Sequence, residues 1–234
     1  MPSRRVHTVL MRASEFLFTA GDLSSALQAR QREASKAVEE WEPDKLLATA
    51  EVDVVEYLIA EYSVACPVLH RDQAQLMPVS EEVAQLPGFW SDEAYERRLT
   101  KIVIVVPLDG EPDVFKYRAS TQTTNPPRGE VHDGELRVAW AGEGAASDPA
   151  AVRQHLDNEL GKIEQYLSWS CGDIERYNTN LRTLITSQVT QRRAKLLADR
   201  NLEAGIGFPS GSGLTRRSTR CRWCDGRSWW PSGR

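Results

Sequence analysis

A long helical pattern over residues 147–203 constrains the fold of this chain more than any other sequence feature. Asp148 followed by Pro149 is typical of a helix start. Core-facing positions then recur in alternating steps of three and four residues, the spacing of a coiled-coil seam. This seam consists of Leu160, Ile163, Leu167, Ser170, Ile174, Tyr177, Leu181 and Leu184. The pattern predicts a helical arm over residues 147–204, with a kink or break expected at residues 168–172, where Gly172 weakens the helix.

The apolar seam needs a partner, and the sequence leaves two possibilities open. The seam can pack against other parts of the same chain, or it can pair with a second copy. In the second case the chain forms a homo-oligomer through Leu160, Ile163, Leu167, Ile174, Tyr177, Leu181 and Leu184.

The order of the predicted elements indicates an α+β fold. Helices are predicted over residues 23–41 and 44–62, followed by strands over 64–70, 75–79, 99–107, 114–119 and 136–140. Strands 99–107 and 114–119 are expected to pair as a hairpin, and Asp133 followed by Gly134 predicts a second hairpin turn. We therefore expect an α+β body over residues 1–146, the helical arm over 147–204 and a disordered tail over 205–234.

Charge and cysteine content restrict the function and the compartment. Residues 210–234 carry six Arg and one Asp, a net charge of +5, so the preceding 209 residues carry −9 of the total of −4. Such an acidic body excludes a broad nucleic-acid surface. Nine acids among residues 33–61 form either an acidic patch for a basic partner or a solvated helical face. Four scattered cysteines suggest no disulfide framework, so a reducing cytoplasm is expected. No apolar run is long enough to predict a membrane span.

One group of residues resembles a metal-dependent nuclease site. Such enzymes often place an Asp at the start of one strand and a Glu-x-Lys on the next, where the acids bind Mg²⁺. Asp113 and the Glu135-Leu136-Arg137 sequence allow a similar arrangement. However, Arg137 stands in the place of Lys and cannot act as a base, and both acids also suit turns. We therefore regard this site as an alternative hypothesis and expect no bound metal or cofactor.

The polar connection over residues 120–129 is a second possible site. Thr121, Thr123, Asn125 and Arg128 could hold a phosphate or another small polar ligand. The competing interpretation is an ordinary polar loop between strands. Cys221 and Cys224 supply only two thiolates, which are too few for a structural zinc ion.

The composition changes after Pro209, where Arg, Ser, Gly and Trp dominate. One interpretation is a nucleic-acid-binding tail that uses its arginines together with Trp223, Trp229 and Trp230. The other is a segment translated out of frame, which would make the chain a truncated form of a longer protein. The second interpretation is favoured because the tail has almost no aliphatic residues.

Five segments carry a resemblance to known proteins: residues 66–70, 115–121, 125–131, 195–200 and 207–209. Over about residues 14–209, the chain resembles bacterial proteins of uncertain role. Some of those proteins resemble antiviral-defence effectors with a Mrr-type restriction endonuclease-like or TIR domain after the helical arm. The basic continuation that such proteins have after Gly-Phe-Pro is not recognisable here, so no catalytic residue is carried over. The resemblance implies a non-catalytic sensor or scaffold region.

Overall fold

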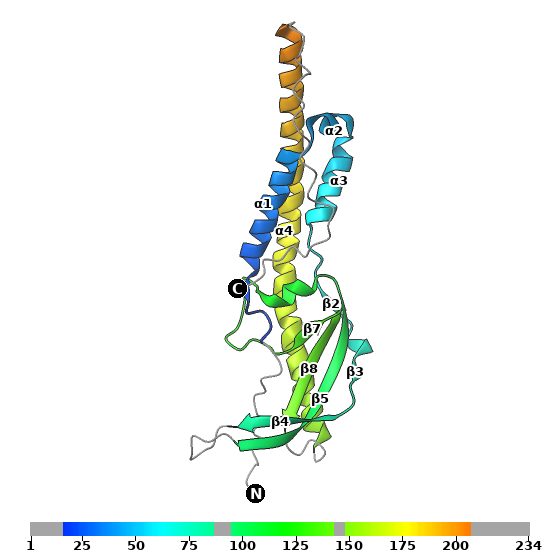
Figure 1. Cartoon of the computed structure of the whole chain (residues 1–234), viewed down its shortest axis with the longest axis vertical. Helices are drawn as coiled ribbons and strands as arrows, with labels where there is room; N and C mark the ends of the chain where they lie inside the picture. Colours follow the sequence, from blue (N-terminus) through cyan, green and yellow to red (C-terminus); the bar gives the residue numbers. More distant parts are fainter. Residues whose placement is uncertain (1–15, 87–94, 143–147, 207–234) are drawn as a thin grey trace. The chain divides into compact units, whose positions relative to one another are not determined.

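The computed structural model describes residues 16–86, 95–142 and 148–206 (Figure 1). It confirms the α+β class, with a small, mainly antiparallel sheet and a long C-terminal helix. Within the described ranges, no helix combines the length and the apolar character needed to cross a bilayer. The α-helices are α1 (Leu23–Glu40), α2 (Pro43–Ala48), α3 (Glu51–Tyr62) and α4 (Pro149–Ile206).

The chain forms two compact units, and helix α4 contributes residues to both. The sheet unit contains, among the described residues, 16–24 and 65–174, whereas the helical unit contains residues 25–64 and 175–206. This division cuts across the predicted body and arm. The helices over residues 23–62 group almost entirely with the C-terminal part of α4, because long helices bury their apolar faces most readily against one another.

The sheet is organised around β5 (Tyr95–Asp109), the longest strand. One edge of β5 pairs antiparallel with β8 (Glu135–Gly142), and β7 (Glu130–His132) flanks β8 (Figure 1). The other edge of β5 is shared by three short strands: β4 (Ser80–Leu86), β3 (Gln75–Leu76) and β2 (Val68–Leu69). The predicted strands over residues 64–70 and 75–79 are therefore shorter than expected, and both pair with β5.

The predicted hairpin at Asp133 and Gly134 is confirmed. Both residues have positive φ angles, 49° and 77°, as the two central residues of a type I′ turn require. Val131 pairs with Leu136 beside the turn. This turn depends only on neighbouring residues, so the Asp133-Gly134 sequence is sufficient to predict that the strands on either side of it pair.

The other predicted hairpin, between residues 99–107 and 114–119, is wrong. Pro112–Lys116 forms a short 3₁₀ helix, η2, which buries Val114 and Phe115. The strand that follows, β6 (Tyr117–Arg118), pairs in parallel with β1 (Gly21–Asp22) instead of with β5. A proline at the first position of η2 favours this helical turn, and burial of Phe115 leads the chain away from β5.

The core of the sheet unit lies between one face of the sheet and the first part of α4. Alternate residues of β5 and β8 point to this face, as the two-residue period of a strand requires. The cluster includes Val106, Leu108, Leu136, Val138 and Trp140 from the sheet, with Val152, Leu156, Leu160, Ile163, Tyr166 and Leu167 from α4. Burying each large apolar side chain stabilises the fold by about 1.5–3 kcal/mol. This cluster therefore holds α4 on the sheet.

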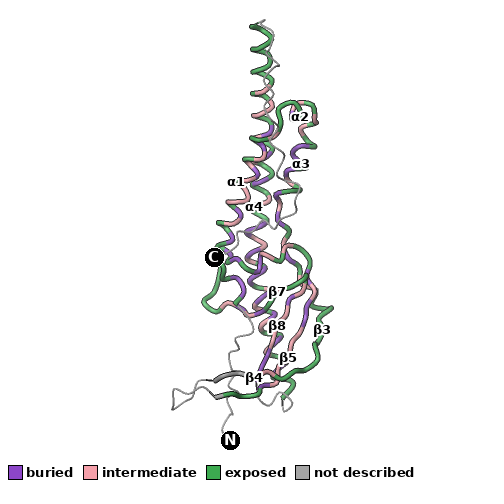
Figure 2. The backbone as a smooth tube through the Cα atoms, viewed as in Figure 1, coloured by how far each residue is buried: buried purple, intermediate pink, exposed green. Residues whose placement is uncertain are grey.

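Helix α4 runs unbroken through residues 168–172, where a break was expected. Ser170 and Ile174 are almost completely buried, so packing outweighs the cost of about 1 kcal/mol for glycine at a helical position. The expected N-cap is confirmed, because the Ala151 amide donates to Oδ1 of Asp148 at 3.0 Å. The buried stripe of α4 continues as predicted to Leu181 (Figure 2). Beyond Leu181 the stripe follows steps of four residues, so Ile185 and Val189 are buried. Leu184, which the predicted seam included, is only half-buried.

In the helical unit, α1 and α3 lie beside the C-terminal part of α4 (Figure 1). The buried Tyr177 hydroxyl donates to the Tyr62 carbonyl at 2.9 Å, and burial raises the pKa of Tyr177 to about 12. The single helix predicted over residues 44–62 is wrong, because Thr49 and Ala50 are extended and separate α2 from α3.

Three arginines bind the carbonyl groups at the C-terminal ends of the three shorter helices. Arg192 donates to the Trp41 carbonyl after α1 at 2.7 Å. Arg193 donates to the carbonyl of Thr49 after α2 at 2.6 Å and also to that of Leu46. Arg30 donates to the carbonyls of Tyr62 and Ser63 at the end of α3, at 3.0 and 3.1 Å. These contacts, called the arginine caps below, satisfy carbonyls that a helix leaves unpaired and place a cation at the negative end of its dipole.

Replacing Arg193 by Met should lower the free energy of unfolding by about 1.5–3 kcal/mol, because several partly buried carbonyls lose a charged donor. Arg200→Met is the matched control, since Arg200 forms an exposed pair with Asp44 and should change stability by no more than about 0.5 kcal/mol. Urea unfolding followed by circular dichroism measures both. Equal losses in the two variants would contradict the capping role of Arg193.

Candidate functional site

Asp113, the first predicted metal ligand, lies in η2 and is engaged in a local ion pair. Lys116 Nζ lies 2.5 Å from Asp113 Oδ1, and the Asp113 side chain is only 16% exposed. The pair arises because residues three apart face the same side of a 3₁₀ helix. The charge of Asp113 is thus compensated within η2.

Glu135 and Arg137 lie on β8, with Leu136 between them. Since Leu136 points to the core, the two charged side chains point to the opposite face of the sheet. Arg137 Nη2 lies 3.4 Å from Glu135 Oε2, so the structure brings these two predicted residues together. Asp113 belongs to another element and pairs with Lys116 instead.

The charged groups on the described part of the chain do not form a metal-binding cluster. No group of three or more His, Cys, Asp or Glu side chains within it is arranged to hold a metal ion. Magnesium needs several oxygen ligands in near-octahedral geometry. Of the three predicted residues, Glu135 and Arg137 pair with each other, whereas Asp113 pairs with Lys116.

The polar loop over residues 120–129 is attached to α4 at two points. Ser120 donates through its amide and its hydroxyl to the Asp173 carboxylate, at 2.7 and 2.8 Å. Thr123 contacts the Tyr166 hydroxyl through its amide, its hydroxyl and its carbonyl, at 3.2, 2.8 and 2.9 Å. Asp173 is buried and Tyr166 belongs to the core. These polar groups therefore fix the loop to the helix.

The four predicted ligand-binding residues of this loop do not share one environment. Thr123 is bound to Tyr166, and the Arg128 guanidinium lies 3.9 Å from the centre of the Phe16 ring, a cation–π contact. Thr123 and Arg128 thus make contacts within the fold, although Thr123 is itself exposed, as are Thr121 and Asn125.

Sequence reasoning missed Asp173 and Tyr166, although each carries a signal. Asp173 lies directly before Ile174 of the predicted seam. A carboxylate beside a buried seam loses water, so it needs a hydrogen-bonding partner. Tyr166 precedes Leu167 in the same way and presents a hydroxyl at the edge of the core. Neither signal identifies the partner, because Ser120 and Thr123 lie 53 and 43 residues away in the sequence.

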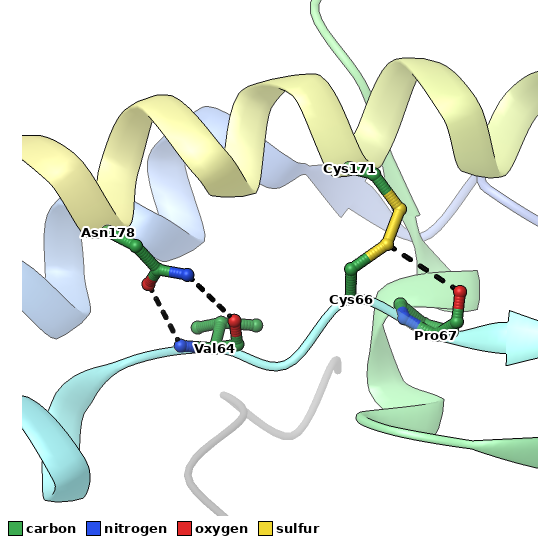
Figure 3. Close-up of a disulfide and its surroundings, with 5 residues drawn as sticks. All are labelled: Val64, Cys66, Pro67, Cys171 and Asn178. Atoms are coloured by element: carbon green, nitrogen blue, oxygen red, sulfur yellow. Dashed lines mark hydrogen bonds between the residues drawn. A yellow bond between two sulfur atoms is a disulfide. The ribbon is translucent and has the colours of Figure 1, made fainter.

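The expectation that the cysteines suggest no disulfide framework is wrong for one pair. Cys66, just before β2, and Cys171, on α4, form a disulfide with their Cα atoms 5.4 Å apart (Figure 3). The two cysteines are 105 residues apart in the sequence. Spacing alone cannot predict such a pairing, since it depends on how α4 docks on the sheet.

Several sequence-based predictions fall outside the described residues. They concern the disordered tail, its arginines and tryptophans, the Cys221–Cys224 pair and the change of reading frame. Gly205 and Ile206, which were assigned to the tail, form the end of α4.

Comparison of the whole chain with protein-family models, curated proteins and solved structures finds no match.

Replacing Asp173 by Asn should lower the free energy of unfolding by about 1.5–3 kcal/mol, because the charged acceptor of two hydrogen bonds is lost. Hydrogen exchange at residues 120–123 should become faster in the same variant. Glu175→Gln is the control, since Glu175 is exposed on the same helix and its change should cost no more than about 0.5 kcal/mol. Unchanged exchange at residues 120–123 would show that Asp173 does not hold the loop.

Proposed function

We propose that this chain is a non-catalytic sensor or scaffold region of a bacterial defence-type protein. The observation that carries the proposal is the use of the polar loop as an attachment for α4. Ser120 and Thr123 direct their hydrogen-bonding groups to Asp173 and Tyr166. Groups engaged in this way fix a helix on a sheet and are not free to bind a substrate.

The segments that carry the resemblance to defence effectors support the same proposal. Residues 66–70 supply Cys66, which is bonded to Cys171, and residues 115–121 supply Ser120, which is bonded to Asp173. Both partners lie on α4. In this proposal, the segments that resemble defence effectors serve to attach the helix within the sheet unit.

A cytoplasmic location is part of this proposal. A disulfide is compatible with a reducing compartment when it forms transiently, as in redox-sensing proteins.

The competing function is a metal-dependent nuclease that uses Asp113, Glu135 and Arg137. We expect the full chain to cleave neither plasmid DNA nor RNA in Mg²⁺ or Mn²⁺ above the level of the Asp113→Asn/Glu135→Gln double variant. The physical reason is that both acids are engaged in ion pairs. Gel electrophoresis of the nucleic acid measures the outcome. Metal-dependent cleavage that disappears in the double variant, with an unchanged circular dichroism spectrum, would replace the scaffold proposal by the nuclease.

Self-association through α4 is the second part of the proposal. The surface that it uses differs from the predicted seam. Leu160, Ile163, Leu167, Ile174, Tyr177 and Leu181 are each less than 10% exposed within the chain, so a second copy could reach them only by displacing what covers them. The last turns of α4 instead expose Leu202 and Ile206, by 65% and 58%, and these two residues share one face of the helix because they lie four residues apart. Exposed apolar side chains at the end of a helix can pair with another helix.

A Leu202→Asp/Ile206→Asp variant should therefore weaken self-association at least about tenfold relative to the unaltered chain, which corresponds to about 1.4 kcal/mol. Val52→Asp is the matched control, because Val52 is 69% exposed on α3 and lies outside the proposed surface. Sedimentation equilibrium over a range of concentrations measures the effect. A monomer mass that does not change with concentration would remove self-association from the proposal.

A further inference from the structure

The Cys66–Cys171 bond joins the segment before β2 to the middle of α4 (Figure 3). Both cysteines are half-buried, so their sulfur atoms are neither sealed in the core nor freely exposed. A small thiol or disulfide can reach a bond in such a position, whereas a fully buried disulfide exchanges only after unfolding.

The sheet unit has an apolar core that does not include this bond. Its core consists of apolar side chains from β5, β8, α4 and the segments around Phe18 and Phe115, and it includes neither cysteine. The Asp173–Ser120 and Tyr166–Thr123 contacts attach α4 independently of the two sulfur atoms. The unit can therefore stay folded in both redox states.

Residues 65–70, called the latch segment below, have few other attachments. The Ala65 carbonyl accepts from the Glu111 amide at 3.3 Å, and the His70 amide donates to the Pro107 carbonyl at 2.9 Å. Between them, β2 contributes only two residues to the sheet, and Pro67 has no amide hydrogen to donate. Leu69 packs against the core, and His70 Nε2 lies 2.8 Å from Asp109 Oδ2. Loss of the disulfide therefore leaves a short edge strand that keeps these contacts within the sheet but has no covalent attachment to α4.

The thiols nevertheless stay close after reduction, because Arg71 follows the latch segment and pairs with α4. Its guanidinium lies 2.8 Å from Asp157 and 3.3 Å from Glu164. Gly110 also fits closely over the latch segment, since a Cβ atom there would lie 2.7 Å from the Cys66 carbonyl oxygen. Tethering of this kind gives the two thiols a high effective concentration, which favours closure of the bond.

We propose that Cys66 and Cys171 form a reversible redox latch that fixes the latch segment to α4. Closure requires a small disulfide of the oxidised-glutathione type. The thiolate of one cysteine attacks this disulfide, forms a mixed disulfide and releases one small thiol. The second cysteine thiolate then attacks the protein sulfur of the mixed disulfide and releases the second small thiol. The cysteines lose two electrons and two protons, which the two small thiols gain, and reduction reverses both steps.

This inference adds a regulatory input and does not depend on the proposed scaffold function. In the closed state the latch segment and β2 are held against α4. In the open state the segment loses its covalent attachment, and the adjoining edge of β5 becomes accessible more often.

The test uses the full chain with Cys221→Ser and Cys224→Ser, so that only one pair can form. The protein is equilibrated in glutathione buffers of increasing oxidised fraction, acid-quenched, alkylated and analysed by mass spectrometry. We expect a linked Cys66–Cys171 peptide that appears and disappears reversibly without denaturant, with unchanged helical circular dichroism. Hydrogen exchange in the latch segment should be about tenfold faster in the reduced state.

Adding Cys66→Ser to this chain supplies the control, because its latch segment should exchange rapidly at every glutathione ratio. The reduced parent protein gives the same comparison should this variant fail to fold. Three results would overturn the proposal: no linked peptide at any ratio, a bond that is reduced only in denaturant, or equal exchange of the latch segment in both states.

Discussion

Burial of the apolar stripe of α4 is the interaction on which the rest of this structure depends. The stripe runs from Val152 to Val189, so a single layer of sheet is too small to cover it. The sheet covers its first part within one unit, and shorter helices lie beside its later part within the other. A helix of this length needs such cover, because the burial of an amphipathic face, rather than local propensity, supplies most helical stability in proteins.

The polar contacts of both units follow from that burial. When helices and loops are packed against α4, their backbone and side-chain polar groups lose water and need new partners. In the helical unit the arginine caps provide donors for carbonyls at three helix ends. In the sheet unit Asp173 and Tyr166 accept the amides of the loop after β6. Polar residues that a sequence search would examine first for catalysis are thus used to complete the packing.

The sequence predicts those features that depend on neighbouring residues. Asp148 as an N-cap, the turn at Asp133 and Gly134, and the stripe as far as Leu181 are all encoded within a few residues, and all are confirmed. The break between α2 and α3 was missed because Arg193, which binds the carbonyls there, lies 144 residues beyond Thr49. The parallel pairing of β1 with β6 and the Cys66–Cys171 bond depend in the same way on distant contacts. For the candidate sites, the sequence predicted which polar residues were of interest, but it did not predict which residues they would contact.

Arg192 and Arg193 are adjacent on α4 yet cap two different helices. Successive residues point about 100° apart around a helix axis, so this pair sets the angular positions of the ends of α1 and α2 around α4. A one-residue insertion between Val189 and Arg192 would rotate both guanidinium groups by that angle and advance them by about 1.5 Å. The stripe would stay covered while both caps pointed elsewhere. In this part of α4 the caps therefore fix both the two arginines and the number of residues that separates them from the buried stripe, whereas the exposed side chains between them carry no such requirement.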